Sequence, residues 1–226
     1  MPKLHMEEVY SNRDESCCPM CRRFGAIHFH SDKNRHYLRC ECCGLVFVPT
    51  RFHLSPLEER AIYDHHQNCP FDDDYRSFLA RLAGARLEQI AFGSTGLDFG
   101  SGPGPTLSLM LAEHGHKVDL YDPFYAPDTN YLSATYDFIT STEVVEHLAR
   151  PGVELEQLWS LIRPSGWLAL MTKRLTSREA FPMWHYKNDP THISFFSEKT
   201  FEILAEKWHT KAEFFGADVV LFKKPN

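Results

Sequence analysis

The fold is decided by the stretch Leu97-Asp98-Phe99-Gly100-Ser101-Gly102-Pro103-Gly104, in which a short apolar strand runs into three closely spaced glycines. A helical pattern follows at residues 106–114, and a second strand at residues 117–121 ends on Asp122. Glycines in such a turn let the backbone pass close to a ligand, and an acidic side chain after the second strand can reach ribose hydroxyls. The stretch therefore predicts a nucleoside-binding turn.

Strand and helix patterns alternate around this turn. Helices are predicted at residues 74–92, 106–114, 153–162 and 197–208, and strands at 96–99, 117–121, 138–142, 167–171, 212–215 and 219–222. Such alternation predicts an α/β fold with a Rossmann-like, doubly wound and mostly parallel sheet. The last two strands are separated by only three residues, so we expect an antiparallel hairpin at the C-terminus.

Cysteines are concentrated near the N-terminus. Cys18 and Cys21 form one C-x₂-C pair, and Cys40 and Cys43 form a second pair after eighteen intervening residues. Four thiolates at this spacing can close a tetrahedron around Zn²⁺. Disulfides are disfavoured in a reducing cytosol, and no thioredoxin-like pattern surrounds the cysteines to indicate a redox pair. The four cysteines therefore predict a structural zinc site.

The segment between the cysteine pairs, residues 23–39, has apolar residues on both sides of the polar turn Ser31-Asp32-Lys33-Asn34, which predicts a β-hairpin. Together with the cysteines it predicts a small N-terminal zinc ribbon at residues 1–50. A polar connector or lid is expected at residues 51–75, and the main domain at 76–226.

Composition limits the classes of protein and partner. Apolar residues make up 43% of the 226 residues, charged residues 24%, and the formal net charge is −6. No apolar run approaches the roughly 18 residues that a membrane-spanning helix needs, and the polar N-terminus has no export signal, so a cytoplasmic location is expected. The negative charge makes a nucleic-acid partner unlikely, and the oligomeric state stays undecided.

From about Arg76 to the C-terminus the chain resembles the class I S-adenosylmethionine-dependent methyltransferases. Four segments match motifs of this family, in the same order along the chain: the glycine turn, Asp122, residues 136–148 and residues 161–168. The resemblance implies S-adenosylmethionine as cofactor, with its methionine end beside Asp98, Gly100, Ser101, Gly102 and Gly104. It implies that Asp122 binds the ribose and that Thr142 and Glu143 lie beside the sulfonium. In the preceding connector, Tyr75-Arg76 and residues 63–68 are a candidate lid in which Arg76 pairs with the methionine carboxylate.

The end of the 138–142 strand carries the sequence Glu143-Val144-Val145-Glu146-His147. It resembles the segment that ubiquinone-biosynthesis O-methyltransferases and small-RNA 3′-end 2′-O-methyltransferases use for Mg²⁺, and His192 stands where those families place a further histidine. This resemblance implies a possible Mg²⁺ ion bound by Glu143, Glu146, His147 and His192, which would lower the pKa of an acceptor hydroxyl. Without an ion, His192 or His185 is the candidate general base.

The predicted reaction is methylation of a small molecule, at a hydroxyl oxygen. Five aromatic residues near His192 are expected to wall the acceptor pocket: Phe181, Trp184, Tyr186, Phe195 and Phe196. Two alternatives stay open at this point. The chain could be a zinc-ribbon-containing RNA methyltransferase, or a non-catalytic partner protein that binds the cofactor.

Overall fold

The computed structural model describes residues 15–65, 68–85 and 90–226, and its main part is a six-stranded sheet. The strand order is β5-β4-β6-β7-β10-β9. The strands are β4 (Thr95–Phe99), β5 (Lys117–Tyr121), β6 (Tyr136–Thr142), β7 (Ile162–Met171), β9 (Ala212–Phe215) and β10 (Val219–Lys223). Strands β5, β4, β6 and β7 are parallel, whereas β10 runs antiparallel to both neighbours. The predicted Rossmann-like sheet with its C-terminal antiparallel hairpin is confirmed.

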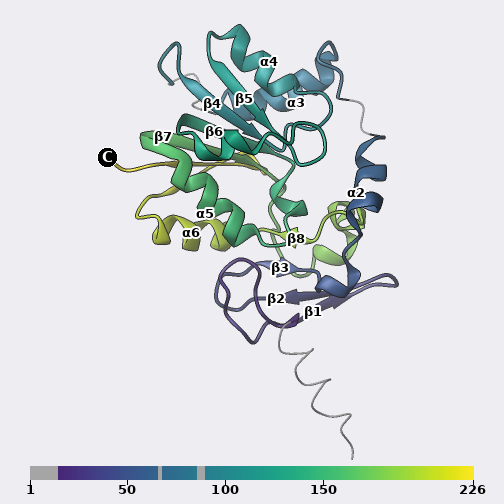
Figure 1. The fold of residues 1–226 in the computed structure, drawn as a ribbon. Coiled ribbons are helices and arrows are strands. Elements are labelled where there is room, and N and C mark those ends of the chain that lie inside the picture. The colour runs from purple at the N-terminus through teal and green to yellow at the C-terminus, as the bar shows by residue number, and fades with distance from the viewer. Residues whose placement is uncertain (1–14, 66–67, 86–89) are drawn as a thin grey trace, which may run out of the picture.

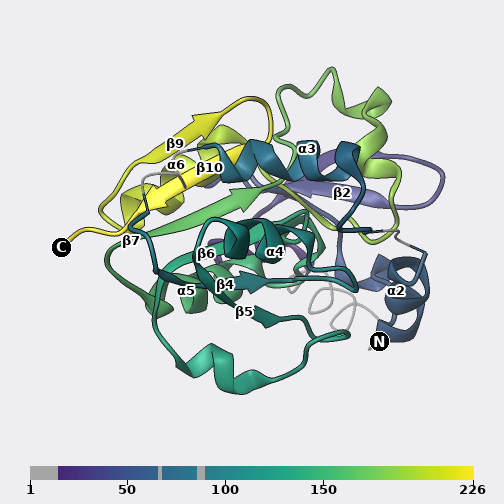
Figure 2. The same ribbon diagram turned by 90° about the horizontal axis from the view of Figure 1, so that it is seen from above.

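Two helices cover each face of this sheet (Figures 1 and 2). Helices α3 (Asp73–Ala83) and α4 (Thr106–Glu113) lie on one face, and α5 (Pro151–Leu161) and α6 (Glu198–Lys207) on the other. Strand β7 shows why helices cover both faces of the sheet: alternate side chains of a strand point to opposite faces, and each face is apolar. Ala169 packs with the α3–α4 cluster, and Leu168 and Leu170 pack with the α5–α6 cluster.

Two segments differ from the sequence prediction. The helix expected over residues 74–92 is wrong in length, because α3 ends at Ala83 with Gly84 at its C-cap; residues 86–89 lie outside the described residues. The expected connector contains a helix, α2 (Pro56–Tyr63), which begins with a capping box between Ser55 and Glu58. Short 3₁₀ helices complete the list: η1 (Thr50–Phe52), η3 (Thr129–Ser133), η4 (Val145–His147), η5 (Phe181–Met183) and η6 (His185–Asn188).

The N-terminal region forms a second, smaller sheet with the order β1-β2-β3-β8. Its strands are β1 (Ile27–Ser31), β2 (His36–Arg39), β3 (Val46–Phe47) and β8 (Ser194–Phe195). The hairpin predicted between the cysteine pairs is confirmed as β1–β2. Strand β8, however, follows β7 in the chain, so the main domain completes the N-terminal sheet (Figure 1). Among the described residues, no helix is long and apolar enough to cross a bilayer.

Candidate active site

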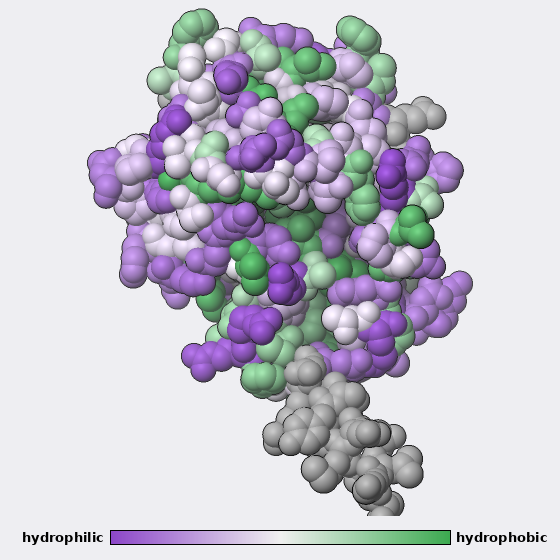
Figure 3. All heavy atoms as spheres, viewed as in Figure 1, coloured by the Kyte–Doolittle hydropathy of each residue, from purple (hydrophilic) through white to green (hydrophobic). Residues whose placement is uncertain are grey.

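A cavity of about 770 Å³ opens at the carboxyl ends of β4, β5, β6 and β7. Ligands of open α/β sheets bind at this edge. Figure 3 shows a recess across the middle of one face, where hydrophobic residues are visible among hydrophilic surroundings. The walls of the cavity fall into two parts. The glycine turn and Asp122 line one part. The residues that line the other part include Glu143, His147, His185, Tyr186, Asp189 and His192.

The glycine turn lines the first part and leaves no room for side chains at two positions. Gly100 has a φ of +78°, and a Cβ there would lie 2.4 Å from a methyl group of Val144. A Cβ on Gly104 would lie 2.0 Å from the carbonyl oxygen of Asn68. Glycine is therefore required at both positions, by backbone conformation at the first and by close approach at both.

Two buried carboxylates hold this turn. Asp122 accepts a hydrogen bond from the Gly102 amide at 3.0 Å, and its other oxygen accepts from the amides of Phe124 and Tyr125 at 2.8 and 3.1 Å. Asp98 accepts from the Thr140 hydroxyl at 2.8 Å, and burial raises its pKa to about 6. The turn between β4 and α4 is thus fixed to the end of β5.

Two glutamates and a tyrosine lie together at the second part: Glu143 and Tyr186 line the cavity, whereas Glu146 is fully buried outside its lining. The Tyr186 hydroxyl donates to Glu146 Oε1 and lies 3.3 Å from Glu143 Oε2. Burial, with the neighbouring Glu146 charge, raises the pKa of Glu143 to about 8, and burial raises that of Glu146 to about 7. Because the two carboxyls interact, their titrations are coupled, and burial favours the protonated form of both.

His192, the last residue of the segment 185–192, is buried. Its Nδ1 lies 2.7 Å from the carbonyl oxygen of Tyr186, which can only accept, so Nδ1 carries the hydrogen and Nε2 keeps a lone pair. Nε2 is 3.9 Å from Asp189 Oδ2. Burial and the adjacent His147 lower the pKa of His192 to about 4, so the imidazole is neutral at pH 7.

His185 also lines the cavity, but its geometry differs. Its Nε2 lies 3.1 Å from the ammonium of Lys173, which donates to it. Lys173 follows β7 by two positions and was missed in the sequence, although the carboxyl end of a parallel strand is where functional groups gather. Asp189 and Glu59, from residues 185–192 and α2, were missed as well.

The proposed magnesium ligands are only partly brought together. Glu146, His147 and His192 each place one ligand atom within 4.8 Å of the others, whereas Glu143 is not part of the group. Two imidazoles and one carboxylate suit a transition metal better than Mg²⁺, which prefers oxygen ligands. The residues brought together here therefore do not fit the expected Mg²⁺ ion.

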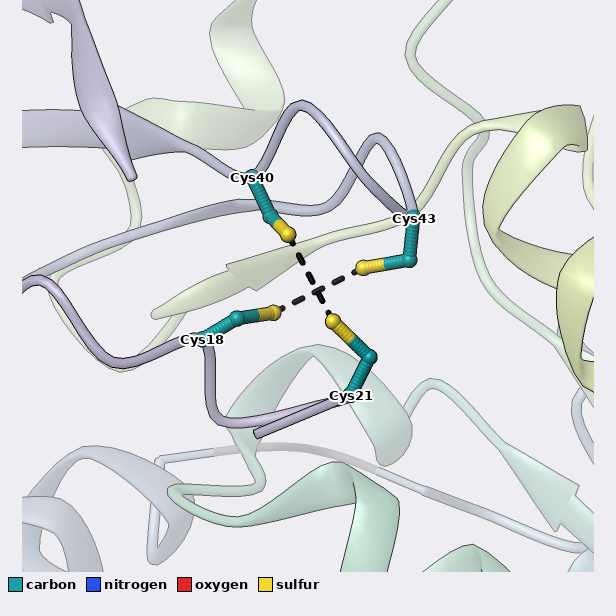
Figure 4. Close-up of side chains that lie close together, drawn as sticks. All are labelled: Cys18, Cys21, Cys40 and Cys43. Atoms are coloured by element: carbon teal, nitrogen blue, oxygen red, sulfur yellow. Dashed lines mark hydrogen bonds between the residues drawn. The ribbon is translucent and has the colours of Figure 1, made fainter. Parts of the chain in front are cut away.

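The four paired cysteines meet at one point (Figure 4). The Sγ atoms of Cys18 and Cys43 are 3.5 Å apart, as are those of Cys21 and Cys40, and all four lie within 4.8 Å of one another. These distances exclude disulfides, which need about 2.05 Å. They agree with the roughly 3.8 Å that separates sulfurs in a tetrahedron of zinc bonds of about 2.3 Å.

The assignment of Arg76 to the cofactor carboxylate needs correction. Arg76 does not line the cavity; its guanidinium pairs with Glu113 of α4 and donates to the carbonyl oxygen of Pro70. The adjacent Tyr75 faces the cavity instead, because successive residues of a helix point about 100° apart. Residues 66–67 of the expected lid lie outside the described residues.

The expected aromatic wall is largely absent from the cavity. Of the five aromatic residues, only Tyr186 lines it. Phe181 and Phe195 are buried against β1–β3, Phe196 stacks on Phe201 at an interplanar angle of 6°, and Trp184 lines a separate, smaller cavity. The irregular spacing of these aromatics reflects burial in two different cores.

Comparisons with known proteins agree on one family. A family model described as a methyltransferase domain matches residues 63–208, more than half of the chain. No curated protein matches.

Several solved structures share the fold. A Burkholderia thailandensis 1,6-didemethyltoxoflavin-N1-methyltransferase with bound S-adenosylhomocysteine is similar at 16% identity and a TM-score of 0.53, covering 89% of this chain and 100% of that one. A Synechocystis magnesium protoporphyrin IX methyltransferase is similar at 14% identity and a TM-score of 0.51, covering 74% and 93%. An O-methyltransferase family protein from B. thailandensis is similar at 13% identity and a TM-score of 0.54, covering 78% and 62%.

Proposed function

The chain belongs to the class I S-adenosylmethionine-dependent methyltransferases, and on that premise we propose that it methylates a hydroxyl oxygen of a small molecule. The observation that carries this proposal is the state of His192. Its Nε2 has a free lone pair in the same cavity as the glycine turn. A neutral imidazole placed there can accept the proton that a hydroxyl loses when it is methylated.

The first part of the cavity fits the cofactor. The hydroxyl oxygens of Ser101 and Thr142 are buried without a hydrogen-bond partner, although both residues line the cavity. Buried polar atoms without partners are rare, so they indicate polar groups of a bound ligand. We assign Asp98 to Gly104 and Thr142 to the methionine end, and Asp122 to the ribose. The bound cofactor supplies an electrophilic methyl group on a sulfonium.

The second part of the cavity orients the acceptor. In the transfer, the bond from the methyl carbon to sulfur breaks with its electron pair going to sulfur, while a bond from the hydroxyl oxygen to that carbon forms. His192 Nε2 takes the hydroxyl proton. Glu143, which lines the second part, has a buried Oε1 without a hydrogen-bond partner, and this oxygen can bind a second polar group of the acceptor. Alignment and exclusion of water supply most of the acceleration in such a displacement.

We further propose that the four cysteines bind a structural Zn²⁺. Burial raises the pKa of Cys21 to about 12. The hydrogen bond that the Cys43 thiol donates to Cys18 raises the pKa of Cys43, together with burial, and lowers that of Cys18 to about 6. Only one of the four sulfurs thus has a partner that favours its thiolate, and a divalent cation at the centre of the cluster would favour the thiolate form of all four. A four-sulfur site has no open position, so this ion would act on the fold and not on the acceptor.

The function is tested with S-adenosylmethionine that carries a CD₃ methyl group. The purified protein is incubated with this cofactor and fractionated small-molecule extracts, and mass spectrometry identifies products that gain the label. NMR of the product shows whether the label is on oxygen. Labelled nitrogen or carbon would contradict the hydroxyl assignment, whereas no product despite S-adenosylhomocysteine binding would favour the non-catalytic alternative.

The role of His192 is tested with two matched variants. His192→Asn is expected to lower turnover about 100-fold, in the usual range for losing a general base, with unchanged S-adenosylhomocysteine affinity by calorimetry. His185→Asn, in the same cavity but with its Nε2 bound to Lys173, is expected to lower turnover less than about threefold. The reverse order would assign the base to His185.

A further inference from the structure

Residues 186–193, called here the His192 loop, have no regular secondary structure beyond the end of η6, so their carbonyl groups need other partners. The partners come largely from the N-terminal sheet. The Arg35 guanidinium donates to the carbonyl oxygens of Pro190 and His192 at 3.0 Å each, to that of Asp189 at 2.6 Å, and to that of Lys187.

Arg35 uses every donor that it has. The remaining N–H, on Nε, donates to the Tyr37 hydroxyl at 3.1 Å. An arginine side chain has five N–H donors in a fixed planar fork, so all five are bound here. Arg35 is 7% exposed, and a buried cation whose partners are removed is costly, so the carbonyl groups and the guanidinium hold each other in place.

Other contacts join the same two regions. The Val48 amide donates to the carbonyl oxygen of Ile193 at 2.9 Å, and β3 pairs with β8 directly after the His192 loop. On the inner side, the Ile193 amide donates to the carbonyl oxygen of Glu146 at 2.9 Å. The His192 loop therefore lies between the N-terminal sheet and the carboxyl end of β6.

We propose that Arg35 is a positioning residue for the methyl transfer: it binds four carbonyl groups of the His192 loop and thereby fixes where His192 Nε2 points. The inference rests on the proposed function, because it concerns the same histidine. The physical basis of the proposal is the hydrogen bond between His192 Nδ1 and the Tyr186 carbonyl, which selects the His192 tautomer. That carbonyl stays in place only while the loop keeps one conformation, and Arg35 spans the loop from Lys187 to His192.

The proposal gives the N-terminal sheet a role in the active site. The guanidinium is anchored by its own hairpin, since Asp32 accepts from the Arg35 amide at 3.0 Å and from the Tyr37 hydroxyl at 2.7 Å. Asp32 also lies 3.4 Å from the Lys187 ammonium in the loop. The hairpin between the cysteine pairs thus supports the site from outside the cavity.

The test reads the His192 imidazole directly and needs no acceptor. Long-range ¹⁵N–¹H NMR spectra of the full chain report which ring nitrogen carries the hydrogen, and His192→Asn assigns the signals. The wild type is expected to show a single Nδ1–H tautomer. Arg35→Gln should give averaged tautomer signals and at least about tenfold faster hydrogen exchange at the Ile193 amide, with S-adenosylhomocysteine affinity and zinc content unchanged.

Three further variants keep the test decisive if Arg35→Gln does not fold. Arg35→Lys keeps the charge but cannot span four carbonyl groups, so intermediate exchange is expected. Millimolar guanidinium should restore the single tautomer in Arg35→Ala. Arg178→Gln is the matched control. Arg178 of the main domain donates a hydrogen bond to the Phe29 carbonyl of the N-terminal sheet, but it does not contact the His192 loop.

Wild-type His192 signals in both Arg35→Gln and Arg35→Lys would overturn the positioning role. So would an equal effect of Arg178→Gln, since it would show general loosening of the N-terminal sheet. These outcomes are separate from failure of the proposed function, which would appear as unchanged turnover in His192→Asn while the Arg35 variants still alter the His192 signals.

Discussion

The two parts of the cavity are built in different ways. Most of the cofactor part, from Asp98 to Asp122, comes from one short stretch of chain, and the hydrogen bond from the Gly102 amide to Asp122 spans 20 residues. The acceptor part collects side chains from α2, η4 and the His192 loop, and the bond from Arg35 to His192 spans 157 residues. We infer that the cofactor part can form without the N-terminal sheet, whereas the acceptor part cannot.

Loss of the metal should separate the two parts most clearly. Cys18→Ser removes one of the four sulfurs, and structural zinc in small modules contributes about 10–16 kcal/mol to folding. We expect loss of bound zinc, at least about 100-fold lower turnover because the His192 loop loses its support, and S-adenosylhomocysteine affinity within about threefold of wild type. Metal analysis, turnover and calorimetry measure these outcomes.

The matched control is Cys42→Ser, which changes an exposed cysteine next to the site that is not one of the four. It should leave zinc content and turnover unchanged. The Pro19 carbonyl, next to Cys18, accepts a hydrogen bond from the Gly152 amide of α5 at 3.3 Å, so loss of the metal should also lower the melting temperature of the main domain. Calorimetry is therefore done well below the melting temperature of the variant. A Cys18→Ser protein that cannot bind S-adenosylhomocysteine while still folded would contradict the independence of the cofactor part.

Gly100→Ala should break the cofactor part and spare the acceptor part. The added Cβ would meet Val144 at 2.4 Å in a left-handed backbone conformation. We expect S-adenosylhomocysteine affinity to fall about 100-fold, near 2.7 kcal/mol, while the His192 NMR signals stay as in wild type.

Gly93→Ala is the control for backbone conformation alone. Gly93 has a φ of +79°, nearly that of Gly100, but a Cβ there meets nothing within 4 Å. This variant should lose about 1 kcal/mol of stability and bind S-adenosylhomocysteine like wild type. If Gly100→Ala and Gly93→Ala weaken S-adenosylhomocysteine binding equally, backbone strain, and not the close approach of Val144, accounts for the effect at Gly100.

The difference between the locally built cofactor part and the acceptor part, built from distant segments, also explains which features could be predicted from the sequence. The strands of the main sheet, the hairpins and the glycine turn depend on neighbours in the chain, so periodicity and glycine spacing predicted them, whereas β8, whose partner β3 is far away in the sequence, was not predicted. The capping box of Ser55 and Glu58 was also readable, and helix α2 was missed only because the surrounding polar residues indicated a connector.

The acceptor part could not be read in this way. Nothing near Arg35 in the sequence indicates that it binds the His192 loop, since its four partners there are ordinary backbone carbonyls. Phe195 was assigned to the pocket because aromatic residues serve cores and pockets alike. Only the three-dimensional arrangement decides which role each residue takes.

The pH dependence of stability gives the smallest and most specific comparison. In the acceptor part, the raised pKa values of Glu143 and Glu146, about 8 and about 7, favour the protonated carboxyls in the folded state. Their contribution to stability is complete below pH 4.5 and is lost as the pH rises to about 8. In the cofactor part, the contribution of Asp98, with a pKa of about 6, is already lost below pH 7.

The two glutamates should therefore lower the melting temperature between pH 6.5 and 8.5, against an opposite contribution from Cys18, whose pKa of about 6 favours the folded state as the pH rises in this range. Glu143→Gln cannot ionise at this position, so its melting temperature should fall less over this range, whereas Asp98→Asn should keep the wild-type slope there and change it only below pH 6. Calorimetric scans of the three proteins, without cofactor, measure the slopes. A wild-type slope in Glu143→Gln would mean that this carboxyl is already ionised in the folded protein, and the acceptor part would then hold a second anion beside Glu146.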